Sequence, residues 1–213
     1  MENVLVAGAH GTTGKQIVAL LKQSQYFKPV AMVREEAHMK MFKNEGVDAV
    51  LVDLEKEVSH AVKNIDKVIF AAGSGGKNVV EVDQEGAKRL VDASKKANIK
   101  KFVMLSSMGA DQPEKAEQLQ EYLKAKHNAD AYLKQSGLNY AIVRPGSLTN
   151  NKPTDHIELK EKLSKQGEIS RADVAQTLVR SLNDDTANNV VFEILEGETL
   201  IGKAMEAVSE IKA

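Results

Sequence analysis

Residues 4–14 read Val4-Leu5-Val6-Ala7-Gly8-Ala9-His10-Gly11-Thr12-Thr13-Gly14, an apolar run that ends in three glycines spaced three apart. The run predicts a buried first strand. Beyond it the apolar residues change to helical spacing, at Ile17, Val18, Leu20 and Leu21, so the glycines are expected at a strand-to-helix turn. The free N–H groups and partial positive charge of such a helix start favour an anion, and glycine lets a phosphate approach the backbone closely.

Two kinds of phosphate-binding loop compete for this turn, and the spacing separates them. A nucleoside-triphosphate loop has the pattern G-x-x-x-x-G-K-[ST]. Here Ala9 stands in place of its first glycine, and Gln16 stands in place of the hydroxyl residue that binds magnesium. The pattern that remains, G-x-x-G-x-x-G directly after the first strand, is a variant of the dinucleotide fingerprint. The sequence therefore predicts a bound dinucleotide, with a merely glycine-rich turn as the alternative.

The composition limits the class of protein. The 213 residues are enough for one α/β domain with a full core, and the chain is short for two domains. Lys and Arg total 29 against 30 Asp and Glu, so the net charge of −1 gives no electrostatic reason to expect nucleic acid or an anionic membrane as a partner. Cysteine is absent, which excludes thiolate nucleophiles, disulfides and cysteine-ligated metals.

Neither a targeting segment nor a membrane span is expected. The start Met1-Glu2-Asn3 has no positively charged region, and no apolar run approaches the roughly 18 residues that cross a bilayer. These observations predict a cytoplasmic protein. No metal is assigned, because paired ligand spacing is missing among the five histidines, which are His10, His38, His60, His127 and His156.

The residue after the second strand bears on the choice of cofactor. This strand is predicted at residues 30–33 and is followed by Arg34. In dinucleotide-binding folds an acidic residue about 20 positions beyond the glycines binds the 2′-hydroxyl of NAD, whereas a nearby arginine accommodates the 2′-phosphate of NADP. Arg34 lies at that distance, which favours NADP(H) over NAD(H). Two alternatives stay open: Arg34 is a solvated residue at a strand end, or Glu35 binds a ribose instead.

Two further strand ends are expected near the cofactor. Asp53 follows the third strand, predicted at residues 49–52, and could accept from an adenine amino group or cap the next helix. The fourth strand, at residues 68–71, opens into Ala72-Gly73-Ser74-Gly75-Gly76, where the backbone is expected to pass close to the cofactor. The alternative, a G-x-S-x-G nucleophile elbow, lacks its first glycine. In the following helix, expected over residues 79–97, Gly86 is expected to permit close approach to the sheet and Asp83 to tie a neighbouring loop.

The fifth strand, predicted at residues 102–105, runs into Ser106-Ser107-Met108-Gly109 at the edge where open α/β sheets hold their chemistry. A later helix carries Tyr122 and Lys126, which share a face because they are four residues apart. Tyrosine is a weak base at neutral pH, and an adjacent ammonium favours its phenolate. We therefore predict that Tyr122 acts as acid/base, that Lys126 activates it, and that Ser107 holds the substrate oxygen.

These motifs resemble the short-chain dehydrogenase/reductase (SDR) superfamily, in particular its atypical small members of the epimerase/dehydratase-like or NAD(P)H-binding kind. The matching residues reach to about residue 150 and are Gly8, Gly11, Gly14, Arg34, Asp53-Leu54, Ala71-Ala72-Gly73, Ser106-Ser107, Tyr122 with Lys126, and Arg144-Pro145-Gly146. The resemblance implies that Lys126 also holds the nicotinamide ribose and that Pro145-Gly146-Ser147 passes the nicotinamide. The resemblance does not indicate the substrate, because the segment after Pro145 is much shorter than the substrate lobe of true sugar epimerases.

Cofactor contacts are accordingly expected at Gly8, His10, Gly11, Thr12, Thr13, Gly14, Arg34, Asp53, Leu54, Ala71, Ala72, Gly73, Lys126, Pro145, Gly146 and Ser147. Among these, His10 either touches phosphate or serves the backbone of the turn. After a sixth strand at residues 141–144, a polar loop to about residue 170 is expected to cover the substrate. Ser170 is expected to cap the next helix, and Arg171 or Asp173 either reaches the pocket or has a solvated or capping role.

A last strand at residues 190–194 and a helix with Ile201, Met205, Val208 and Ile211 are expected to close the chain. The sequence thus predicts an α/β fold, a Rossmann-type doubly wound parallel sheet that forms a single domain over residues 1–213, with a small C-terminal substrate-side lobe. The predicted function is that of an NADP(H)-dependent oxidoreductase acting on a small carbonyl compound or alcohol. Three alternatives remain: an epimerase or dehydratase, a non-catalytic NADPH sensor, and a flavin reductase. The substrate, the reaction direction and the oligomeric state stay open.

Overall fold

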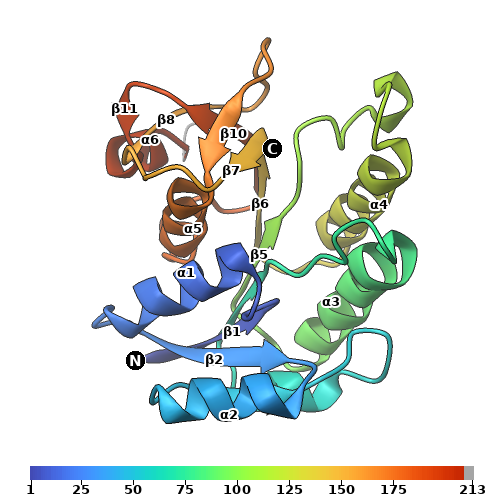
Figure 1. The fold of residues 1–213 in the computed structure, drawn as a ribbon, viewed down its shortest axis with the longest axis vertical. Coiled ribbons are helices and arrows are strands. Elements are labelled where there is room, and N and C mark those ends of the chain that lie inside the picture. Colours follow the sequence, from blue (N-terminus) through green and yellow to red (C-terminus); the bar gives the residue numbers. More distant parts are fainter. Residues whose placement is uncertain (209–213) are drawn as a thin grey trace.

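The computed structural model describes residues 1–208; residues 209–213, and with them Ile211 of the predicted last helix, lie outside the described residues. Within residues 1–208 the main sheet has nine strands in the order β11-β8-β10-β6-β5-β4-β1-β2-β3 (Figure 1). Its parallel strands are β1 (Glu2–Ala7), β2 (Phe27–Val33), β3 (Asp48–Leu51), β4 (Lys67–Phe70), β5 (Lys101–Leu105), β6 (Tyr140–Pro145) and β10 (Val190–Glu196). β8 (His156–Lys160) pairs antiparallel with both β10 and β11 (Thr199–Leu200).

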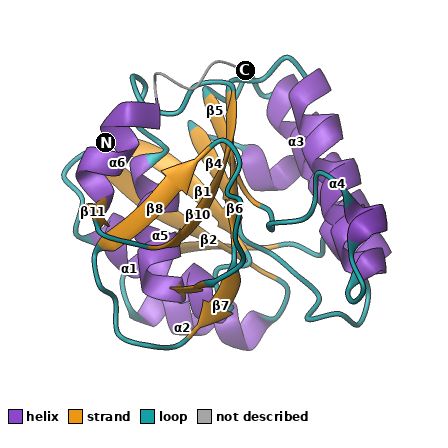
Figure 2. Cartoon of the chain, turned by 90° about the horizontal axis from the view of Figure 1, so that it is seen from above, coloured by secondary structure: helices purple, strands orange, loops and turns teal. Residues whose placement is uncertain are grey.

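Helices cover both faces of this sheet. Figure 2 shows α3 and α4 on one side and α1, α2, α5 and α6 on the other. The α-helices are α1 (Thr12–Lys22), α2 (Glu36–Asn44), α3 (Ala87–Lys96), α4 (Gln120–Gln135), α5 (Arg171–Arg180) and α6 (Ile201–Ala207). Short 3₁₀ turns are η1 (Ser59–Val62) and η3 (Pro113–Lys115), and η2 (Val79–Gly86) is π-helical.

The first strand shows why the fold is doubly wound. Val4 and Val6 belong to the core under α1, whereas Leu5 and Ala7 belong to the core under α3, and all four are completely buried. Successive strand residues point to opposite faces, so a strand buried on both faces must be apolar throughout. Burial of one such Val or Leu side chain contributes about 1.5–3 kcal/mol. The prediction of a buried first strand from the apolar run is therefore confirmed.

The strand order places a crevice beside β1. β1 lies between β2 and β4, so the chain continues in opposite directions along the sheet on its two sides. In open α/β sheets, ligands bind at the carboxyl ends of the strands where the order reverses in this way. The ends of β1, β2, β4 and β5 therefore meet where the sequence predicts the cofactor.

β2 and the helix after β4 differ from the sequence-based expectation. β2 begins at Phe27 and includes Pro29, which is tolerated because β3 pairs with β2 only from Val30 onward. The helix expected over residues 79–97 is π-helical through Gly86 and α-helical afterwards. A Cβ on Gly86 would lie 2.9 Å from the Cβ of Leu54, so this glycine does permit the expected close approach.

The segment expected as a polar loop after β6 contains three strands. β7 (Ser147–Thr149) and β9 (Glu168–Ser170) pair with each other, and β8 joins the main sheet. Ser170 caps α5 as expected, because its Oγ accepts from the N–H of Asp173 at 3.0 Å. Asp173 is buried and accepts from the backbone N–H groups of residues 154 and 155, and Arg171 donates to the carbonyl of Leu148. Both side chains therefore hold the chain leading into β8.

Candidate functional site

The turn after β1 is packed so tightly that two of its glycines have no room for a side chain. Gly8 has a φ of +83°, and a Cβ added to it would lie 2.6 Å from the Cα of Ala72. A Cβ on Gly14 would clash with the carbonyl of Gly8. Gly11 closes the turn by donating its N–H to that same carbonyl at 3.0 Å. The glycines thus let β1, α1 and the segment after β4 approach one another.

The start of α1 has hydrogen-bond donors to spare. Its N-cap is Gly11, no side chain of the described residues caps it, and its first turn holds no acidic residue. Thr12, Thr13 and Gly14 form that first turn. The first N–H groups of a helix have no partner within the helix, and a phosphate suits such an end through both hydrogen bonds and the helix dipole. The turn therefore fits the pyrophosphate of a dinucleotide.

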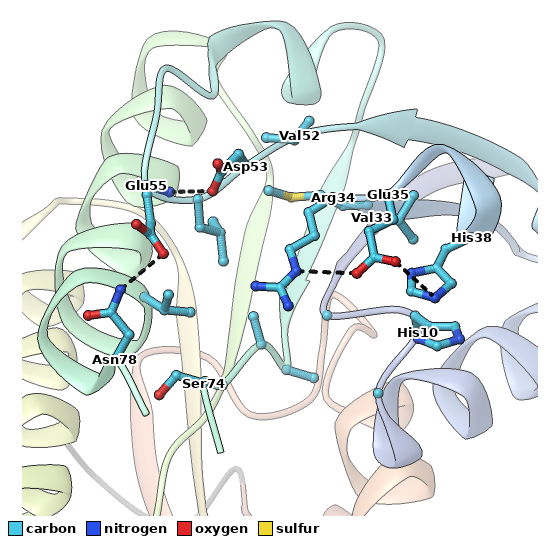
Figure 3. Close-up of a pocket in the computed structure, with 18 of the residues that line it drawn as sticks. His10, Val33, Arg34, Glu35, His38, Val52, Asp53, Glu55, Ser74 and Asn78 are labelled. Atoms are coloured by element: carbon cyan, nitrogen blue, oxygen red, sulfur yellow. Dashed lines mark hydrogen bonds and ion pairs between the residues drawn. The ribbon is translucent and has the colours of Figure 1, made fainter. Parts of the chain in front are cut away.

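A cleft of about 450 Å³ opens beside the glycine turn, and we call it the first cleft. Figure 3 shows Arg34 pointing into its middle from the end of β2, with His10 and His38 on one side and Asn78 on the other. The predicted cofactor residues that line it are Gly8, His10, Gly11, Arg34, Asp53, Leu54, Ala71, Ala72 and Gly73. Residues that are widely separated in the sequence thus meet at one edge of the sheet.

Charges at the first cleft are loosely held. The side chain of Arg34 is 74% exposed, and its Nε lies 3.7 Å from a carboxylate oxygen of Glu35. The other oxygen of Glu35 lies 3.7 Å from Nε2 of His38. Asp53 accepts from the N–H of Glu55 at 3.0 Å, so it closes a turn after β3 instead of capping a helix. The guanidinium of Arg34 is therefore free enough to turn toward a ligand phosphate.

His38 and Asn78 are among the residues of this cleft that the sequence analysis did not predict. His38 reaches it from the first turn of α2, and its imidazole stacks on that of His10. Asn78, at the end of the second glycine-rich turn, donates from Nδ2 to a carboxylate oxygen of Glu55 at 3.0 Å. The sequence signal that could have identified His38 was its position in the first turn of the helix that follows Arg34. No sequence signal marked Asn78, because its hydrogen-bond partner Glu55 belongs to a different loop.

A buried carboxylate joins the second glycine-rich turn to α4. Asp83, on η2, accepts from the N–H of Ser74 at 3.0 Å and from its Oγ at 2.9 Å. The Nζ of Lys126 lies 3.5 Å from the other oxygen of Asp83 and donates to the carbonyl of Leu105 at 3.3 Å. Asp83 therefore ties a loop, as expected. Lys126 is buried and, in the described structure, lines neither cleft.

A second cleft, of about 860 Å³, lies at the ends of β5 and β6. It brings together Ser107 and Tyr122, and the predicted residues Pro145, Gly146 and Ser147 line it as well. The Nζ of Lys126 lies 5.6 Å from the centre of the Tyr122 ring. A Cβ on Gly146 would clash with Leu195 and with the carbonyl of Gly167, so packing alone accounts for this glycine.

The two serines after β5 have different surroundings. Ser106 is buried, and its Oγ donates to Oδ2 of Asp130 at 2.8 Å. Arg144 donates to the same oxygen from Nε and Nη2, at 3.0 and 2.8 Å. Burial raises the pKa of Asp130, although the Arg144 guanidinium opposes the shift. Ser106 is thus held in a buried network, whereas Ser107 lines the second cleft, with its Oγ donating to the carbonyl of Met108 at 3.2 Å. Asp130 was missed, although it continues the four-residue spacing of Tyr122 and Lys126 along α4.

The described part of the chain contains neither a metal site nor a membrane-spanning helix. Residues 1–208 contain no cluster of three or more His, Cys, Asp or Glu side chains that could hold a metal ion. Across the same residues, none of the helices is both long and apolar enough to cross a membrane.

The fold and the first cleft define a dinucleotide-binding α/β protein of the Rossmann type. The chain belongs to the NAD(P)H-binding family, which matches residues 8–185. The uncharacterized sugar epimerase YhfK of Bacillus subtilis is 38% identical over 211 residues, which cover 95% of this chain and 98% of YhfK.

Two solved structures agree with this assignment. A putative NAD-dependent epimerase/dehydratase from Bacillus halodurans superposes with a TM-score of 0.92 at 36% identity and covers 97% of this chain and 99% of its own. The oxidoreductase ylbE from Lactococcus lactis superposes with a TM-score of 0.87 at 31% identity, with coverages of 98% and 97%. The family and the nicotinamide cofactor are thereby shown, and the epimerase and oxidoreductase names of these relatives leave the reaction open.

Proposed function

We propose that this protein is an NADPH-dependent oxidoreductase that acts on a small carbonyl compound or the corresponding alcohol. The observation that carries the proposal is the placement of the two clefts along one carboxyl edge of the sheet. The first lies at the ends of β1, β2 and β4, and the second at the ends of β5 and β6. An extended dinucleotide with its adenosine in the first cleft would direct its nicotinamide toward the second.

The second cleft supplies groups for proton transfer. When bound, the reduced nicotinamide supplies a hydride. Tyr122 donates the proton to the carbonyl oxygen, and the Ser107 hydroxyl holds that oxygen in line. Lys126 activates Tyr122, because its buried ammonium faces the ring and favours the phenolate. To hold the nicotinamide ribose as well, its Nζ would have to turn away from Asp83.

The preference for NADPH rests on Arg34. It ends β2 at the rim of the first cleft and has only a distant carboxylate partner. A charge-assisted hydrogen bond to the 2′-phosphate contributes about 1.5–3 kcal/mol, which corresponds to roughly a ten- to hundredfold preference over NADH.

An epimerase is the second candidate, favoured by the names of YhfK and the Bacillus halodurans protein. Such an enzyme would return the hydride to its substrate and would consume no NADPH in net terms. The two functions therefore differ in whether NADPH absorbance falls during turnover.

The test is an NADPH absorbance assay against a panel of aldehydes, ketones and quinones. Tyr122→Phe should retain NADPH binding and lose turnover by about a hundred- to ten-thousandfold, the usual effect of removing a general acid. Tyr132→Phe is the matched control, because this tyrosine lies on the same helix but bonds to Asp92 outside the clefts. Equal turnover of Tyr122→Phe and the wild type would refute the mechanism.

A further inference from the structure

Two histidines from distant parts of the sequence stack face to face at the first cleft. His10 comes from the glycine turn after β1, and His38 from the first turn of α2. Their ring centres lie 3.4 Å apart with an angle of 16° between the planes. Figure 3 shows the pair at one side of the cleft, with Glu35 between it and Arg34, whose guanidinium points into the middle. Both rings line the cleft, so a ligand there can reach them.

The charges around the pair make it responsive to protons. Burial lowers the pKa of His10, and the neighbouring His38 and Lys15 lower it further, whereas Glu35 raises it. These are the ionisable groups that face His10: Lys15 from α1, His38 from α2, and Glu35 from the β2–α2 junction. His38 faces His10 and Glu35. Two stacked cations would repel each other, which is how the neighbouring His38 contributes to the lowered pKa of His10.

A phosphate beside the pair would change this balance. The 2′-phosphate of NADPH carries a charge of about −1.5 to −2 near neutral pH, whereas NADH has a neutral hydroxyl in its place. Arg34, His10 and His38 line the same cleft, and a phosphate held between the guanidinium and the stacked rings would bring that negative charge to the pair. An imidazolium there would donate a charge-assisted hydrogen bond that the neutral ring donates only weakly.

We propose that His10 and His38 form a proton-dependent part of the 2′-phosphate site, so that one proton on the pair strengthens the binding of NADPH and not that of NADH. This inference rests on the proposed use of NADPH and extends it, because it adds a pH-dependent element to the discrimination by Arg34. Binding of NADPH then takes up a proton, and binding of NADH does not.

The test compares NADPH and NADH affinities at about pH 6 and about pH 8, on either side of the ordinary histidine range. The variants are His10→Asn/His38→Gln and the single His38→Gln, and the matched control is His60→Gln, a histidine outside the first cleft. The 2′-phosphate itself titrates near pH 6, so the readout is the difference between wild type and variant with the same ligand. Calorimetry in two buffers of different ionisation enthalpy measures the proton uptake directly.

The wild type should prefer NADPH over NADH by about tenfold more than the double variant at about pH 6, with little difference at about pH 8. His38→Gln alone should lose about half of this effect on a logarithmic scale, so the test stands even if the double variant does not fold. His60→Gln should match the wild type.

Three results would overturn the inference. If the variants keep the wild-type preference and proton uptake at both pH values while NADPH binding still depends on Arg34, the inference fails and the proposed function stands. If the variants lose NADPH and NADH affinity equally, the stack only supports the turn. If the wild type binds no NADPH at all, the inference and the proposed function fail together.

Discussion

The ion pair between Asp83 and Lys126 offers a sharp test of how the two clefts are connected. Asp83 is 1% exposed and Lys126 is 4% exposed, so neither charge is solvated. In Asp83→Asn the ammonium of Lys126 loses its carboxylate partner, whereas an amide oxygen in the place of Oδ2 can still accept both hydrogen bonds from Ser74. Removing one partner of a buried pair costs about 3–5 kcal/mol; the 3.5 Å separation places this pair at the lower end, at about 3 kcal/mol.

Urea unfolding of Asp83→Asn, Lys126→Met and the double variant measures this coupling. The double variant should be more stable than the sum of the single losses implies by at least about 1 kcal/mol, because it leaves no buried charge alone. The melting temperature of Asp83→Asn should fall by about 6–12 °C. The control Asp92→Asn, which only makes an exposed hydrogen bond from Tyr132 a neutral one, should stay within about 1 kcal/mol of the wild type. Additive effects of the two substitutions would refute the buried pair.

Three other predictions concern the edge and the turns of the sheet. Burial lowers the pKa of Lys101 to about 8. Between about pH 8 and about pH 10 the unfolded chain therefore holds more protons than the folded one, and the free energy of unfolding should rise by up to about 1 kcal/mol per pH unit. Urea titrations of Lys101→Met should lack this rise. Gly8→Ala should cost about 2 kcal/mol or more, because its φ is positive and its Cβ would meet Ala72, whereas Gly46→Ala, with a positive φ but open space, should cost about 1 kcal/mol by the same measurement. Glu35→Gln should raise NADPH affinity about two- to fivefold in fluorescence titrations, because it removes an exposed carboxylate beside the guanidinium that is expected to bind phosphate; unchanged affinity would place the phosphate elsewhere.

Local patterns in the sequence predicted the site residues that directly follow a strand or lie on one face of a helix. The switch from an apolar run to helical spacing located the β1–α1 turn, and the distance from the glycines located Arg34 at the end of β2. Ser107 and Tyr122 were predicted from a strand end and a helix face, and in the structure both line the second cleft. These inferences need only the period of each element and the rule for the carboxyl edge.

Features that depend on contacts between distant elements could not be predicted in the same way. The stack of His10 on His38 requires the position of α2 relative to the glycine turn. Asp83 was expected to tie a loop, but its pairing with Lys126 depends on how η2 packs against α4. The strand β8 did carry a local signal, because Ile157 and Leu159 alternate with polar residues, but the polar segments on either side of it suggested a loop.

The most direct test of the central claim is a fluorescence or calorimetric titration of the purified protein with NADPH and then with NADH, repeated on Arg34→Ala. We expect NADPH to bind roughly ten- to hundredfold more tightly than NADH, and Arg34→Ala to remove this difference while NADH affinity is unchanged. Binding of neither cofactor would contradict the account, the proposed catalytic roles of Tyr122 and Ser107 included. Equal binding of both by the wild type would refute the assignment of Arg34 to the 2′-phosphate.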